Sequence, residues 1–149
     1  MPAIRSYKES DFDACMEIMA GNVPDYFAAN EIEDFKAYLQ ALPGPYLVLE
    51  EEGSLMACGG YVIDTEKRAA GLCWGMVSRT HHKRGLGAQL LDVRLDAIRR
   101  SGRADTVVID TSQHSAPFFE RFGFKETGCI PDGYGKGLDQ IDMTRVLDE

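Results

Sequence analysis

The sequence predicts an α/β protein in which helices pack on a mixed sheet, as a single domain over residues 1–149. The length of 149 residues fits one domain, and 44% hydrophobic with 27% charged residues is an ordinary globular composition. Along the chain, strand-like segments joined by short turns give way to an alternation of strands and helices. We therefore expect an N-terminal strand and two helices, an antiparallel meander, and then a β-α-β-α-β pattern.

The N-terminal third predicts one strand and two helices. Residues 3–7 have a strand-like pattern. Residues 9–20 place apolar side chains at helical spacing, with Ser10 or Asp11 as the cap. A second helix is expected over residues 30–42, because the Pro-Gly-Pro that follows cannot continue it.

The middle of the chain predicts an antiparallel meander of three strands. These are residues 45–51, 54–64 and 69–78, each rich in apolar and β-branched side chains. Glu52 with Gly53 makes the first connection tight, and four polar residues make the second. Short connections of this kind join antiparallel neighbours.

The last part of the chain predicts the alternating pattern. Residues 86–102 form a helix that ends in arginines and a glycine, as helix C-termini often do. The remaining elements are a strand at 106–110, a short helix at 116–122, and closing strands at 124–130 and 140–147.

A glycine-rich turn, HHKRGLGAQLL, joins the meander to the strongest helix. The first turn of a helix presents unpaired N–H groups and the positive end of its dipole. Gly85 and Gly87 would let an anion approach the backbone, and Lys83 and Arg84 would add charge. The pattern indicates a phosphate site, although a plain surface turn stays open. It matches neither a P-loop nor the dinucleotide fingerprint, which needs a third glycine at Leu90.

Charge and composition exclude several classes of function. The formal charge of −8 disfavours nucleic acid and favours cationic partners. No signal peptide or membrane-length apolar run is present, so no membrane partner and a cytoplasmic location are expected. We expect no metal site, since His81 and His82 are adjacent and lack a third ligand. The scattered cysteines predict buried small hydrophobic residues: Cys15, Cys58, Cys73 and Cys129.

Two segments resemble the GNAT superfamily of N-acetyltransferases. H-K-R-G-L-G-A at 82–88 resembles its acetyl-CoA diphosphate loop, and A-P-F-F-E-R-F-G-F at 116–124 resembles a helix beside the cofactor. His82 departs from the usual Gln or Arg, and Phe119 departs from the usual Tyr. The resemblance implies a GNAT-like fold whose sheet is splayed between the strands near 69–77 and 106–110.

The resemblance also implies acetyl-CoA as co-substrate and a set of residues around it. The arm of the cofactor would pair with the backbone near Met76 and Val77. The expected diphosphate residues are His82, Lys83, Arg84, Gly85, Leu86, Gly87 and Ala88. The expected residues on the cofactor's other side are Gln113, Phe118, Phe119 and Arg121.

Acetyl transfer to an alkyl amine needs a base, because the free ammonium has a pKa near ~10.4. The candidates are Asp110, His114 and Glu31, with the first two favoured because they flank the expected opening. With Phe119 in place of the usual Tyr, Tyr134 in the glycine-rich loop PDGYGKG could supply the acid, and Tyr26 is a weaker candidate. For each of these groups a purely structural or solvated role stays open.

The expected function is transfer of the acetyl group of acetyl-CoA to a primary amine of a small molecule or peptide, and the acidic charge balance favours a cationic acceptor. The alternative is a catalytically silent acyl-CoA-binding sensor or subunit, which the loss of the usual Tyr at Phe119 favours. A homodimer stays open as the assembly.

Overall fold

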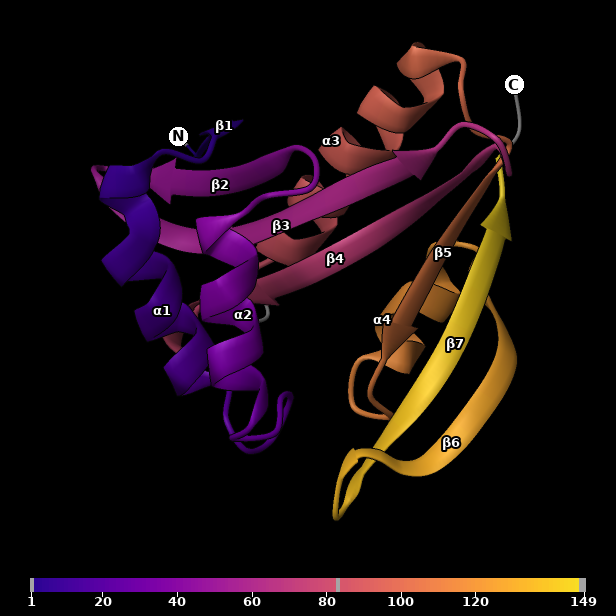
Figure 1. Ribbon diagram of the computed structural model, residues 1–149. Coiled ribbons are helices and arrows are strands. Elements are labelled where there is room, and N and C mark those ends of the chain that lie inside the picture. Colours follow the sequence, from indigo (N-terminus) through magenta and orange to yellow (C-terminus); the bar gives the residue numbers. More distant parts are fainter. Residues whose placement is uncertain (1, 83, 148–149) are drawn as a thin grey trace.

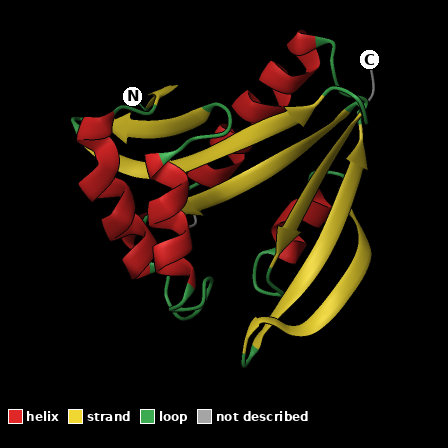
Figure 2. Cartoon of the chain, in the orientation of Figure 1, coloured by secondary structure: helices red, strands yellow, loops and turns green. Residues whose placement is uncertain are grey.

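The computed structural model describes residues 2–82 and 84–147. In these residues the strands form one sheet, in the order β1-β2-β3-β4-β5-β7-β6. Helices cover both faces of the sheet (Figures 1 and 2). The predicted α/β class with a mixed sheet is confirmed. None of the helices described is long and apolar enough to cross a membrane.

The N-terminal elements follow the predicted order. They are β1 (Ala3–Ser6), a 3-10 turn η1 (Glu9–Asp11), α1 (Phe12–Gly21) and α2 (Glu31–Gln40). The second helix is shorter than predicted, because the backbone leaves the helical region at the residue after Gln40.

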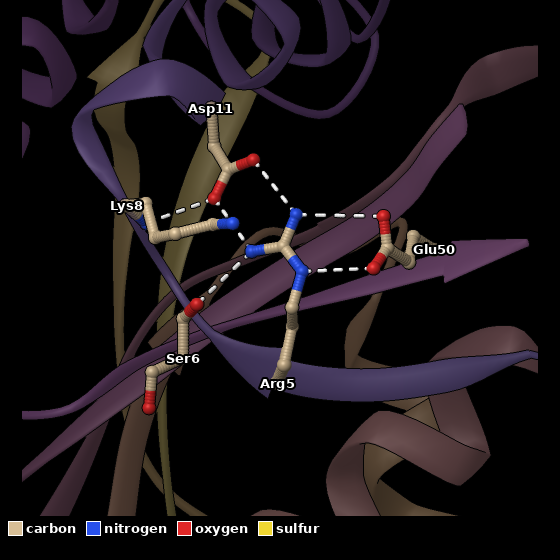
Figure 3. A network of polar contacts seen from close by, with 5 residues as sticks. All are labelled: Arg5, Ser6, Lys8, Asp11 and Glu50. Carbon is tan, nitrogen blue, oxygen red and sulfur yellow. Dashed lines mark hydrogen bonds and ion pairs between the residues drawn. The ribbon is translucent and has the colours of Figure 1, made fainter. Parts of the chain in front are cut away.

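Asp11 is the N-cap residue of α1, as predicted, but its side chain makes no capping hydrogen bond to this helix and instead joins a network around Arg5 (Figure 3). The Arg5 guanidinium donates to both carboxylate oxygens of Asp11, at 2.8 and 2.9 Å, and to Glu50 at 2.8 Å. The backbone N–H of Lys8 also donates to Asp11, at 2.8 Å. The hydrogen bond from Arg5 lowers the pKa of this nearly buried carboxyl. The network ties β1 and η1 to the neighbouring strand.

The predicted meander is present as β2 (Tyr46–Glu51), β3 (Ser54–Asp64) and β4 (Ala69–Val77), all paired antiparallel. Its last pair contains a bulge that the sequence pattern did not indicate. Gly60 pairs with Cys73 and Cys58 pairs with Met76, so two residues of β4 oppose one of β3.

The rest of the chain follows the predicted alternation. Its elements are α3 (Leu86–Ser101), β5 (Thr106–Thr111), α4 (Ala116–Arg121), β6 (Lys125–Gly135) and β7 (Leu138–Val146). Helices α3 and α4 pack on one face of the sheet, and α1 and α2 cover the other face at β2 to β4 (Figure 1).

Two sequence predictions need correction here. The segment PDGYGKG was expected to be a loop, but β6 continues to Gly135, because an irregular pairing with β7 absorbs the extra residues after Ile130. Tyr134 therefore stands on a strand. The cysteines were expected to be buried, and Cys15 and Cys58 are, but Cys73 is half-buried and Cys129 is exposed on an edge strand.

The sheet opens between β4 and β5, as the resemblance implied. These strands run parallel and pair only from Ala69 with Thr106 to Gly71 with Val108. Beyond that point β4 continues to Val77 and β5 to Thr111, and the two strands separate (Figure 1). The edge of β4 that faces the opening therefore has no strand partner beyond Gly71.

Candidate active site

The N-terminus of α3 borders one end of the opening. Gly85 adopts a left-handed φ of 77°, and a Cβ built on it would meet no atom within 4 Å. No side chain among the described residues caps this helix. The Gln89 N–H donates a helical backbone hydrogen bond to the Gly85 carbonyl at 3.1 Å. The first-turn N–H groups therefore have no capping side chain among the described residues, and this end of α3 fits an anion such as a diphosphate.

Gly87 lies in a crevice between the end of β4 and α4. A Cβ built there would lie 3.5 Å from Val77 and 3.6 Å from Phe118, which is ordinary contact. The ring of Phe118 borders the crevice and lies under the Arg121 guanidinium, 5.6 Å from its centroid. Phe119, by contrast, is buried in the core below α4. Of the two rings, Phe118 is the one beside the glycine loop.

The basic and imidazole groups of the loop are already engaged. His82 Nε2 lies 2.9 Å from the Val77 carbonyl oxygen, and its ring packs edge-on against Tyr26. Arg84 donates to Glu51 at 3.1 Å. Lys83, the remaining basic residue predicted to contact the diphosphate, lies outside the described residues. Among the described residues of the loop, what is left for an anion is chiefly the backbone.

The residues predicted along the arm of the cofactor lie on the two sides of the opening. Met76 is buried and Val77 half-buried at the end of β4. On the other side, the Gln113 amide donates to the Gly137 carbonyl at 2.8 Å, and its oxygen accepts the Asp139 N–H at 2.9 Å. Gln113 thus anchors the β6–β7 hairpin.

The predicted proton-transfer groups lie around the C-terminal end of β5. The Tyr134 hydroxyl of β6 donates a short hydrogen bond to the Asp110 carboxylate of β5. Glu31, at the start of α2, accepts the Ala28 N–H at 2.8 Å. His114 follows β5 and packs edge-on against Tyr26, at 6.1 Å between ring centroids. The fold thus brings together groups far apart in sequence.

Burial and mutual repulsion shift the pKa values of this acidic group. Burial raises the pKa of Glu31, and the nearby charge of Asp110 raises it further. Burial and the hydrogen bond to Asp110 raise the pKa of Tyr134 well above its ordinary value. The phenol therefore keeps its proton at neutral pH and can serve as a donor.

A cavity of about 270 Å³ lies where β4 and β5 separate. Two carboxylates, two threonine hydroxyls and several apolar side chains line it. The sequence singled out only one of these residues, since the others lie at positions of β4, β5, β6 and β7 that carry no motif. The lining residues are Gly71, Leu72, Val108, Ile109, Asp110, Thr127, Asp142, Met143 and Thr144.

Within the described residues, no group of three His, Cys, Asp or Glu side chains is arranged to hold a metal ion. The chemistry available at the opening is therefore that of carboxylates, a phenol, an imidazole and backbone N–H groups.

Comparisons with known proteins agree with this architecture. The chain superposes on the ribosomal-protein-S18-alanine N-acetyltransferase from Escherichia coli with a TM-score of 0.82 and 21% identity, covering 100% of this chain and 96% of that one. A ribosomal-protein-alanine N-acetyltransferase from Brucella melitensis gives 0.77 and 20%, with 97% and 99% covered. An aminoglycoside 6'-N-acetyltransferase complexed with coenzyme A gives 0.79 and 13%, with 99% and 98% covered. These likenesses establish the fold.

The family follows from the sequence itself. A family model described as "Acetyltransferase (GNAT) domain" matches residues 23–147. No curated protein sequence matches the chain significantly. The family match spans the glycine loop, the opening and the acidic group, and it confirms the predicted enzyme class, with acetyl-CoA as the acetyl donor. The chain belongs to the GNAT acetyltransferase family.

Proposed function

We propose that the protein transfers the acetyl group of acetyl-CoA to a primary amine of a cationic small molecule or peptide. The observation that carries this proposal is the pair Asp110 and Tyr134, with Glu31 nearby, where β5 borders the opening. Carboxylates at this place suit an ammonium group, and the overall charge of −8 favours its approach.

The donor would bind along the opening. The backbone of residues 84–88 would hold the diphosphate, assisted by the predicted side chains of His82 and Lys83. The unpaired edge of β4 at Met76 and Val77 would pair with the arm. Phe118 and Arg121 would cover the other side, and the predicted contacts of Gln113 and Phe119 would complete it.

The chain's own groups would handle the proton of the amine. Asp110 is the proposed base, because its carboxylate stands where β5 has left β4 and borders the cavity. Tyr134 would hold that carboxylate in place through its hydroxyl. His114 is the second candidate for the base, since it follows β5 at the same end. Deprotonation is required because an ammonium has no lone pair with which to attack.

An amine panel tests this proposal. The protein is incubated with acetyl-CoA and diamines, amino-acid amides or short peptides, while free thiol is measured and products are identified by mass spectrometry. We expect thiol release that depends on the amine and falls in Asp110→Asn. The exposed Glu33→Gln serves as the matched control. Binding of acetyl-CoA by calorimetry without release for any amine would instead support the silent acyl-CoA-binding alternative.

A further inference from the structure

Arg94 of α3 is a buried cation that lies beneath the bulge of β4. It is 4% exposed, and its Nη1 donates to the Gly60 carbonyl at 3.2 Å. Its Nε is buried and has no hydrogen-bond partner among the described residues. None of the ion pairs found in those residues includes it. Burying an unpaired charge costs several kcal/mol, on the order of the net stability of a small domain.

Two glycines provide the space for the guanidinium. A Cβ on Gly59 would lie 3.0 Å from Arg94 Cζ, and a Cβ on Gly75 would lie 3.0 Å from its Nη2. Both distances are shorter than ordinary carbon contacts, so a larger side chain at either position would displace the cation. The positive charge therefore lies directly against the bulge of β4. In this part of β4 one edge pairs with β3 and the other edge faces the opening.

The positive charge of Arg94 affects the ionisation of the Cys73 thiol. Cys73 of β4 accepts a hydrogen bond from the Tyr38 hydroxyl at 3.5 Å. Burial raises the pKa of Cys73, whereas the Tyr38 hydrogen bond and the charge of Arg94 lower it, and the charge of Asp110 raises it. The thiol of Cys73 on β4 thus experiences both the positive charge of Arg94 and the negative charge of Asp110.

Within residues 2–82 and 84–147, no carboxylate forms an ion pair with this cation. The titratable groups that act on it are Tyr46, Cys73, Cys58 and Tyr38, from strands β2, β4 and β3 and helix α2. Burial lowers the pKa of Arg94, but a guanidinium starts so high that it stays charged at neutral pH. The fold therefore holds a permanent positive charge against the strand that lines the opening.

We infer that Arg94 stabilises the thiolate of coenzyme A as it leaves the acetyl group, an inference that rests on the acetyl transfer proposed above. In that step the amine nitrogen bonds to the acetyl carbon, and the carbon–sulfur bond breaks with its electron pair going to sulfur. The amine proton passes to the base, and the thiolate afterwards takes a proton from water. Phe119 carries no proton to give, and the Tyr134 hydroxyl is directed at Asp110. A fixed charge in a water-poor site serves instead of an acid.

The ionisation of bound coenzyme A tests this inference without turnover. The thiolate is titrated by its ultraviolet absorbance, as the difference between complexes with coenzyme A and with its desulfo analogue. An ordinary thiol has a pKa of ~8.5, and we expect the bound thiol to titrate about one unit lower. Arg94→Met should raise that value by about one unit and lower kcat about tenfold, with KM for acetyl-CoA within threefold. Arg94→Lys should retain most of both effects.

The exposed Arg99→Met, on the same helix, is the control that removes one positive charge elsewhere and should change neither quantity. A wild-type bound thiol that titrates at or above the free thiol overturns the inference even if the Arg94 variants fail to fold, and it leaves the proposed acetyl transfer standing. An unchanged titration in a folded Arg94→Met overturns it as well. Failure of coenzyme A to bind would overturn both proposals.

Discussion

At the scale of single residues, the glycine loop depends on two positions with different requirements. Gly85 needs its left-handed φ to start α3, whereas Gly87 needs the space between Val77 and Phe118. The sequence predicted the loop from this spacing. It could not indicate that Arg84 would bond to Glu51, which is distant in sequence, or that the His82 ring would turn back to the Val77 carbonyl at the end of β4.

Gly87→Val should weaken acetyl-CoA binding at least tenfold, or more than ~1.4 kcal/mol, by calorimetry. The first added carbon fits beside Val77 and Phe118, so the helix should still form, but the two methyl groups would fill the crevice. Ala97→Val, on the same helix far from the loop, is the control. Unchanged affinity in a folded Gly87→Val would remove the diphosphate from this loop.

Tyr134→Phe should lower kcat about tenfold and leave KM for acetyl-CoA within threefold, since it removes only the hydroxyl that holds Asp110. Steady-state kinetics with an accepted amine checks this, with Tyr61→Phe on β3 as the matched control. A change below threefold contradicts the holding role. A loss of ~10² or more would also contradict it, because Tyr134 would then be the proton donor itself.

At the scale of elements, most boundaries followed from local pattern. The meander was predicted from its short connections and α3 from its periodicity and C-terminal glycine, and both are present. The two features that the sequence did not predict have the same cause. The continuation of β6 through Tyr134 and the bulge in β4 depend on pairing with another strand, and a glycine-rich segment does not encode that pairing locally.

The Arg5 network gives a stability prediction at this scale. Asp11→Asn should lower the free energy of unfolding at pH 7 by about 1–3 kcal/mol, because it removes the charge from the more buried of the two carboxylates that Arg5 contacts. The folded pKa of Asp11 is depressed below 3.8, so its contribution is present above that pH and lost as the pH falls through the folded value. Urea denaturation at several pH values measures the free energy of unfolding and its dependence on pH.

The exposed Asp13→Asn, on the first turn of α1, is the control for that measurement and should have little effect. The decrease in the free energy of unfolding caused by Asp11→Asn should shrink at acid pH. A decrease that stays constant down to the most acid pH at which the protein folds would contradict a charge-dependent role.

At the scale of the whole molecule, the opening between β4 and β5 organises the function. The resemblance implied the splay, and the strand pairing shows it, because β5 pairs with β7 along its whole length but with β4 over only three residues. The clustering of Asp110, Tyr134 and Glu31 could not be foreseen from sequence, since it joins two strands and a helix. The single domain over residues 1–149 and the homodimer stay predictions.

The crystal structure of the protein with acetyl-CoA tests the central claim most directly. We predict that the diphosphate accepts hydrogen bonds from the N–H groups at the start of α3, and that the arm pairs with the edge of β4 at Met76 and Val77. The acetyl group should then face the end of the opening that holds Asp110. A diphosphate bound away from Gly85 to Ala88, or an arm that leaves the opening empty, would contradict the account.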